Sequence, residues 1–164
     1  MSAPTPSPEA RPRIDRLVDE VGRGLDGLAQ LRALMASGRA PGIMTTLGFS
    51  FTEVEPGRAV FTGMPGEHVY NPIGTVHGGW AATLLDSACG CAAHSRLSAT
   101  QAYTTLELKV AFHRPITRDT GLLRAESALL SFGRRAAYAE AKLVDTEGRL
   151  YASATSTLLV FDRS

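Results

Sequence analysis

The sequence predicts an α+β protein in which a curled antiparallel sheet wraps around one long central helix, with an extra helix on the N-terminal side. The first observation is a buried helix, because residues 80–95 contain no proline and are apolar on nearly every face. The second is a set of runs with a two-residue period, two before this helix and four after it, several of them joined by hairpin-length connections. Wrapping the sheet around the helix buries both.

A chain of 164 residues has the size of one domain, so a two-domain cofactor enzyme is not expected. Its 44% hydrophobic and 20% charged residues are typical of a globular protein. With a formal net charge of +1, the protein lacks the strong positive electrostatic field that is typical of proteins that bind nucleic acids or anionic membranes. Residues 1–13 contain no apolar core of a secretory signal, and no apolar stretch reaches the ~20 residues of a membrane span. We therefore expect a cytoplasmic protein that binds neither nucleic acid nor membrane.

The N-terminal part is predicted to be a tail followed by a helix. Residues 1–12 are rich in Pro, Ser and Ala and indicate a disordered tail. Residues 13–45 form a helical segment, whose apolar positions follow helical spacing: Ile14, Leu17, Val18, Val21, Leu25, Leu28 and Leu31. Three glycines each lower its stability by up to about 1 kcal/mol relative to Ala, so the helix depends on docking: Gly22, Gly24 and Gly27.

Residues 46–164 carry the main domain. Phe49 and Phe51 alternate with polar residues, and a turn signal at 55–57 precedes a returning strand over 58–64. Residues 65–76 are expected to be loop. After the helix, a four-strand meander is predicted, with later strands over 121–130, 136–144 and 149–161. In its first strand Leu106, Leu108 and Val110 alternate strictly with polar residues.

Two features of the central helix suggest chemistry. Asp86 is the only ionisable residue between His77 and His94, and a buried carboxylate needs a partner, a polar cleft or a chemical role. A structural cap or an arginine pair is the alternative. At the start of the helix, Gly78 and Gly79 expose backbone N–H groups at the positive end of the dipole, which favours an anion. The alternative there is a flexible junction.

The spacing of these two features predicts a shared site. Gly78 and Asp86 lie eight positions apart, which is roughly 12 Å along a helix and too far for both to touch one small carbonyl. If both act on one group, Gly78 of one chain must face Asp86 of another across a two-fold interface. We therefore expect at least a homodimer.

The two cysteines indicate neither a disulfide nor a metal site. Cys89 and Cys91 are two positions apart in a helix, where their side chains point in different directions. They are interpreted as small core residues. A metal or redox site with His94 is the alternative, although the chain has no further cysteine.

Two runs of residues carry a family resemblance: NPIGTVHGG at 71–79 and ATLLDSA at 82–88. They resemble the signature of the hot-dog-fold acyl-CoA thioesterases, in particular the PaaI-like branch of phenylacetate degradation, and the likeness runs from about residue 47 to 161. The resemblance implies a homodimer, commonly paired into a homotetramer. It also implies hydrolysis of an acyl-CoA thioester by water, without metal or other cofactor. Aryl, phenylacetyl and short or medium acyl groups all stay open.

The resemblance also implies catalytic roles. The Gly78 N–H would polarise the thioester carbonyl, and Asp86 of the opposing chain would be the nucleophile or general base. Asn71 would place the substrate or water, and His77 would hold the loop at the carbonyl end of the site. One other branch carries a helper hydroxyl one turn after the carboxylate, but that position here is Gly90.

Either of two neighbouring threonines could supply the hydroxyl that orients the attacking water. Counted back from Pro115, Thr105 matches the residue that orients the attacking water in the family. Thr104 competes with it, because the two-residue period puts Thr104 on the face of Leu106 and Leu108.

Further candidates for binding substrate or CoA have structural alternatives. Arg134 and Arg135 would suit CoA phosphates, but arginines in a turn are often only solvated, and the same holds for His113 and Arg114. Gly79 and Trp80 would border the substrate, although a buried tryptophan is often plain core. Two rival functions remain, namely a hot-dog enoyl-CoA hydratase or dehydratase, and a non-catalytic acyl-CoA-binding module.

Overall fold

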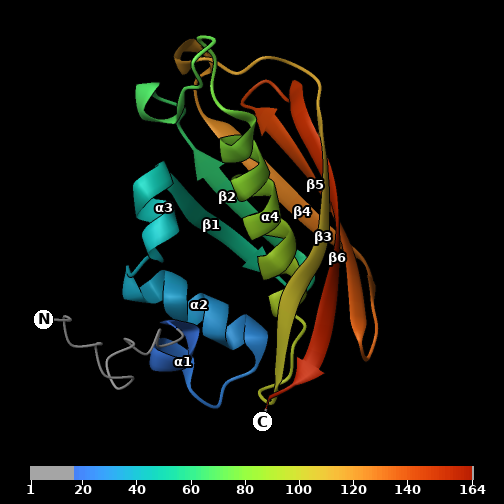
Figure 1. The fold of residues 1–164 in the computed structure, drawn as a ribbon. Helices are drawn as coiled ribbons and strands as arrows, with labels where there is room; N and C mark the ends of the chain where they lie inside the picture. Colours follow the sequence, from blue (N-terminus) through green and yellow to red (C-terminus); the bar gives the residue numbers. More distant parts are fainter. Residues whose placement is uncertain (1–16, 164) are drawn as a thin grey trace, which may run out of the picture.

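The computed structural model describes residues 17–163, and within them six strands form one antiparallel sheet that curls around helix α4 (Gly78–His94) (Figure 1). The strands are β1 (Phe49–Glu55), β2 (Arg58–Gly63), β3 (Gln101–Phe112), β4 (Leu123–Phe132), β5 (Ala136–Asp145) and β6 (Leu150–Asp162). Their order in the sheet is β1-β2-β4-β5-β6-β3. This arrangement confirms the predicted fold class.

The core lies between α4 and the concave face of the sheet. Leu84, Leu85 and Ala88 of α4 are fully buried, and Leu143 and Leu158 meet them from the strands. Because α4 contacts all six strands, apolar residues are needed on most of its faces. None of the helices in the described part of the chain has the length and hydropathy of a membrane span.

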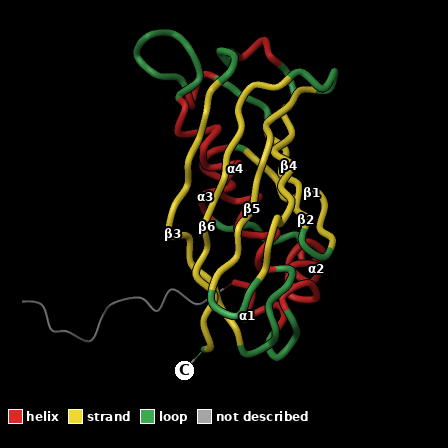
Figure 2. Tube along the Cα trace, turned by 90° about the vertical axis from the view of Figure 1, so that its right-hand side faces the viewer, coloured by secondary structure: helices red, strands yellow, loops and turns green. Residues whose placement is uncertain are grey.

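The strand order corrects one prediction. The strands β4, β5 and β6 form a meander, but β3 does not join it through β4. Instead β3 pairs with β6 along its whole length, from Gln101↔Asp162 to Phe112↔Ala152, and Figure 2 shows it at one edge of the sheet. The connection over residues 113–122 contains a short 3-10 helix (Arg118–Thr120). It is long enough to cross the end of the sheet, whereas a hairpin would need only about two to five residues.

A bulge in β3 corrects a second prediction. The pairing of β3 with β6 shifts between Thr105 and Glu107, which leaves Leu106 as the extra residue, 61% exposed. The strict alternation predicted for this strand is therefore wrong at Leu106. Before the bulge, Tyr103 and Thr105 face α4, and after it Leu108 and the next alternate residues do.

The N-terminal helix that the sequence predicts is present but divided into α1 (Leu17–Gly22), α2 (Gly27–Ser37) and α3 (Gly42–Leu47). Gly24 breaks it with a φ of 78°, a conformation that favours glycine, and the Asp26 side chain caps the start of α2. The predicted tail over residues 1–12 lies outside the described residues.

Helix α2 docks on the C-terminal end of α4. The Gly27 N–H donates to the Leu97 carbonyl at 2.9 Å, and a Cβ at position 27 would lie 1.8 Å from the His94 carbonyl oxygen. The buried His94 Nε2 also lies 2.9 Å from Gln30 Oε1. Glycine at position 27 weakens the isolated helix but allows this close contact between the two backbones.

Candidate active site

The start of α4 is organised by His77. Its Nδ1 accepts a hydrogen bond from the Gly79 N–H at 2.8 Å, so the ring caps the helix as an unprotonated acceptor at that nitrogen. Among the described residues the Gly78 N–H has no acceptor, as is usual in a first helical turn. Gly78 lines a pocket of about 410 Å³, here called the helix-start pocket. One backbone donor is thus left at the positive end of the helix dipole.

Gly78 is also required by packing. A Cβ at this position would lie 2.9 Å from the Phe112 ring at the end of β3. The missing side chain therefore lets β3 approach the helix and leaves the backbone open to a ligand.

Asn71 belongs to the same pocket. Its Oδ1 accepts hydrogen bonds from the backbone N–H groups of Ile73 and Thr75, at 3.1 and 3.2 Å, and its Nδ2 donates to Thr75 Oγ1 at 2.9 Å. The amide fixes the loop that precedes His77. The structure thus brings Asn71, His77 and Gly78 together at one end of α4.

Asp86 lies half-buried in the middle of α4. The Thr105 hydroxyl donates to Asp86 Oδ1 at 3.2 Å, whereas the neighbouring Thr104 is exposed. Thr105 and not Thr104 meets Asp86 because the bulge at Leu106 sets which face of β3 is turned toward the helix. Within residues 17–163, no basic side chain lies within ion-pair distance of Asp86, so the alternative of an arginine pair does not apply.

The surroundings of Asp86 are poorly solvated. Burial raises the pKa of the Cys91 thiol to about 12, and the Asp86 charge adds to this shift. Burial, together with the same charge, also raises the pKa of the Tyr103 phenol. In such a setting a carboxylate interacts strongly with nearby charge and hydrogen-bond donors.

A second pocket of about 490 Å³ begins beside Thr105. It lies between α1 and α2 on one side and β3 and α4 on the other, and is called here the α2–β3 pocket. Thr104 and Thr105, both singled out from the sequence, line this pocket, but the rest of its walls was not predicted, since they come from segments that are far apart in the chain. Tyr103 and Leu34 are examples, and no local pattern marks either of them.

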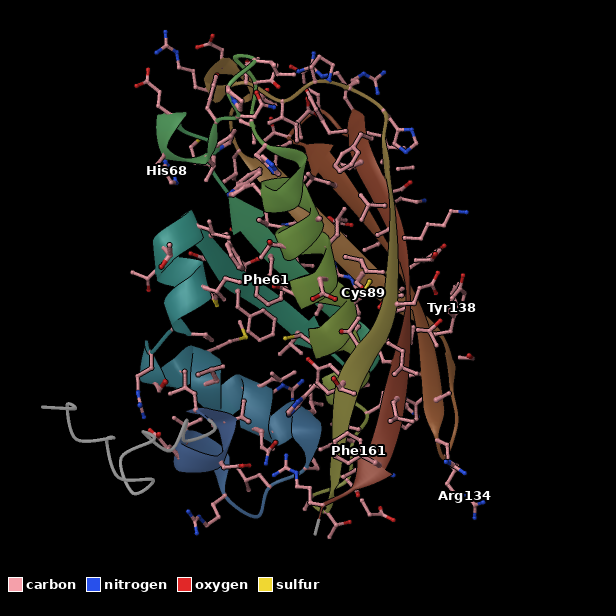
Figure 3. All side chains as sticks on the ribbon, in the orientation of Figure 1. Phe61, His68, Cys89, Arg134, Tyr138 and Phe161 are labelled. Atoms are coloured by element: carbon pink, nitrogen blue, oxygen red, sulfur yellow. The ribbon has the colours of Figure 1, made fainter. Side chains whose placement is uncertain are left out.

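The remaining predicted residues lie elsewhere. Arg134 and Arg135 are exposed at the β4–β5 hairpin, at the opposite end of the protomer from the start of α4 (Figure 3). His113 and Arg114 do line the helix-start pocket. Trp80 is 2% exposed and its indole N–H donates to the Leu47 carbonyl at 2.8 Å, which is the position of a core residue.

The cysteines are free thiols inside the fold. Burial raises the pKa of Cys89 to about 11, so this thiol stays protonated at neutral pH. In the part of the chain that the structure describes, no group of three or more His, Cys, Asp or Glu side chains is arranged to hold a metal ion.

Comparisons with known proteins agree with this architecture. Residues 73–152 match the family model of the thioesterase superfamily. The chain is 25% identical over 119 residues to a 1,4-dihydroxy-2-naphthoyl-CoA hydrolase from Listeria monocytogenes serotype 1/2a (strain 10403S), covering 73% of this chain and 95% of that protein.

Two solved structures extend the likeness to the fold. A thioesterase family protein from Silicibacter pomeroyi has 29% identity and a TM-score of 0.71, covering 80% of this chain and 96% of its own. A mutant of the phenylacetic acid degradation protein PaaI from Thermus thermophilus has 28% identity and a TM-score of 0.66, covering 73% and 98%. The chain therefore has the hot-dog fold and is a thioester hydrolase, and its match to the thioesterase superfamily model covers residues 73–152.

Proposed function

We propose that the protein hydrolyses acyl-CoA thioesters to a free acid and CoA in a site shared by two copies of the chain. One observation carries the proposal. Asp86 has a hydrogen-bonded hydroxyl and no cationic partner among the described residues, while the helix-start pocket offers a free backbone N–H about two helical turns away. Eight residues of helix span roughly 12 Å, so each protomer supplies one half of the machinery.

The first half binds the carbonyl. The Gly78 N–H donates to the thioester oxygen, and the helix dipole stabilises the negative charge that develops on it during attack. His77 and Asn71 hold the loop and the first turn in place through the bonds described above. A rigid donor needs no reorganisation when the charge appears.

The residues that drive the attack on the carbonyl carbon, Asp86 and Thr105, come from the opposing protomer. In the general-base form, a water oxygen adds to the carbonyl carbon while Asp86 takes the water proton and Thr105 orients the pair. The tetrahedral intermediate then collapses, the C–S bond breaks, and the CoA thiolate takes up a proton. In the nucleophilic form, Asp86 attacks the carbonyl carbon, the C–S bond breaks, and the CoA thiolate leaves and takes up a proton. Water then hydrolyses the mixed anhydride, which releases the acid and restores the Asp86 carboxylate. Both routes use only side chains, backbone and water, without a metal or redox cofactor.

The edge strand β3 supports the dimer. Leu106 and Phe112 on this strand are 61% and 56% exposed, and an edge strand with large apolar side chains is a ready surface for a second copy. A two-fold pairing there would bring Asp86 of one copy toward the helix-start pocket of the other. Further pairing into a homotetramer stays a prediction.

The CoA part would leave the site on the Gly78 side. His113 and Arg114 line the helix-start pocket, so they are the nearest candidates for its phosphates in the same protomer. Arg134 and Arg135 would reach CoA only from the partner subunit, because of their place at the far hairpin.

The test is CoA release from a panel of acetyl-, octanoyl- and phenylacetyl-CoA. Asp86→Asn is expected to lower turnover by at least about 100-fold, the usual contribution of a catalytic acid or base. Glu107→Gln, an exposed carboxylate on the same strand as Thr105, is the matched control and is expected to keep wild-type turnover. Equal turnover by Asp86→Asn and wild type would refute the role of Asp86.

The rival functions are outcomes of the same test. Binding without CoA release, unchanged by Asp86→Asn, would indicate an acyl-CoA-binding module. Hydration of an enoyl-CoA that is abolished in His77→Ala would indicate a hydratase.

The shared site has its own test. Gly78→Pro removes the N–H at a first helical position, where proline suits the backbone although its Cβ crowds the Phe112 ring, and Asp86→Asn removes the carboxylate. Refolded together in equal amounts, the two inactive variants form mixed dimers with one intact site, so about a quarter of wild-type activity should return. Mixed dimers without activity would refute the shared site.

A further inference from the structure

The α2–β3 pocket has no role in the chemistry described so far, yet it begins beside the hydroxyl that donates to the candidate carboxylate. Thr105, which donates to Asp86, lies at one end of it, and Phe161 and Arg163 near the end of β6 lie at the other. Figures 1 and 3 show α1 and α2 beside this part of β3 and α4. A group attached to a carbonyl at Asp86 would therefore lie next to this end of the pocket.

The walls of the pocket are largely apolar. Val18 comes from α1, Leu31 and Leu34 from α2, and Phe161 from β6. Tyr103 contributes its ring from β3, with its hydroxyl packed against α4, since a Cβ at position 90 would lie 2.5 Å from that oxygen. The volume of about 490 Å³ is within the range of small-molecule pockets.

Two of the titratable side chains that line the pocket, His94 and Arg163, are already engaged. His94 Nε2 shares a hydrogen bond of 2.9 Å with Gln30 Oε1. Arg163 pairs with Asp19 at 2.5 Å, and its Nε donates to the Gln101 carbonyl at 2.8 Å. A polar substituent beside these two groups would have to compete with their bonds, so this part of the pocket favours an apolar occupant.

We propose that this pocket takes the acyl group of the thioester, that its occupant is largely hydrocarbon, and that α1 and α2 set its size. This assignment rests on the proposed function. Both helices precede residues 73–152, so the acyl specificity would come from outside the residues that match the thioesterase superfamily model. The pocket lies on the Asp86 side, whereas the CoA leaves on the Gly78 side, which keeps the two ends of the substrate apart.

The experiment fills or enlarges the pocket at Val18, a half-buried residue of α1 that is not part of the main core. Val18→Trp is expected to lower kcat/KM for octanoyl-CoA by at least about tenfold, as for a hydrophobic pocket that has lost space, and to leave acetyl-CoA within about twofold. Leu25→Trp is the matched control. Leu25 is 42% exposed in the same segment and lies outside the pocket, so this variant should change neither value.

The outcomes separate this proposal from the proposed function. If the wild type releases no CoA from any substrate, the proposed function is refuted and the acyl assignment with it. If the wild type is active but Val18→Trp changes octanoyl- and acetyl-CoA hydrolysis equally, or changes neither, only the acyl assignment is overturned. If circular dichroism shows Val18→Trp to be unfolded, Val18→Ala decides, with an expected rise in the dodecanoyl-to-octanoyl ratio of kcat/KM; an unchanged ratio overturns the assignment.

The hydrocarbon preference is tested on the wild type alone. Phenylacetyl-CoA and 4-hydroxyphenylacetyl-CoA differ by one hydroxyl group. We expect kcat/KM to be at least about tenfold lower for the hydroxylated substrate, because its hydroxyl would leave water for a pocket with largely apolar walls. Equal values would overturn this part of the proposal.

Discussion

Protonation of His94 should loosen the contact between α2 and α4. The ring is 7% exposed, and the Gln30 amide nitrogen donates to the Gly22 carbonyl, so Gln30 Oε1 is left to accept from the neutral His94 Nε2–H. Burial and then the Arg163 charge lower the pKa of His94 from 6.5 to about 4, with a smaller opposing effect from Asp19. The folded protein therefore disfavours the imidazolium.

The sign of the pH dependence follows from this shift. Between pH 6.5 and about 4 the unfolded chain binds more protons at this position than the folded chain, so stability is lost as the pH falls through that range. A shift of this size corresponds to about 3 kcal/mol in the free energy of unfolding, most of which is lost by about pH 4.

The assay is urea unfolding at intervals from about pH 7 to about pH 4, on the wild type and two variants. Acidic groups also change stability in this range, so the informative quantity is the difference in pH dependence between proteins. His94→Gln should flatten the curve by about 3 kcal/mol. His113→Gln, at an exposed position, should keep the wild-type curve. A His94→Gln curve parallel to the wild type would refute the reasoning.

Three substitutions probe close contacts. Gly27→Ala should cost about 3 kcal/mol or more in urea unfolding, because its Cβ would meet the His94 carbonyl oxygen at 1.8 Å; a loss below about 1 kcal/mol would contradict that contact. Trp80→Phe removes the indole donor to a backbone carbonyl and should cost about 1–3 kcal/mol, measured as a lower Tm. Gly90→Ala should cost about 1–3 kcal/mol, and Tyr103→Phe should restore part of it in the double variant, since the clash is with the phenolic oxygen; no restoration would argue against it.

The fold was predictable where the pattern is local. The buried helix shows as an apolar run without proline, and each hairpin shows as two alternating runs around a turn. The partner of β3 was not predictable in this way, because a connection of about ten residues can lead to either edge of a sheet. The division of the N-terminal helix depends on Gly24 and on docking to α4, and only the glycine is visible in the sequence.

The candidate site was predictable to a similar extent. Asp86 stood out as a lone carboxylate in an apolar helix, and Gly78 as a glycine at a helix start. The choice between Thr104 and Thr105 was not predictable from period alone, since one extra residue reverses it. The α2–β3 pocket needs Val18 and Tyr103 to lie close together, and residues so far apart in the chain leave no shared pattern.

The extra residue at Leu106 divides β3 into two parts, here called phases, that differ in which alternate side chains face α4. Upstream of it the odd-numbered side chains face the helix, and downstream the even-numbered ones do. Deleting Leu106 would therefore give a regular strand in which Thr105 still meets Asp86, because the residues on either side of the bulge already pair with consecutive residues of β6. Removing a residue from the middle of either phase instead would turn the side chains beyond it to the other face. Position 106 is thus the place where this strand can lose a residue and keep the hydroxyl beside the carboxylate.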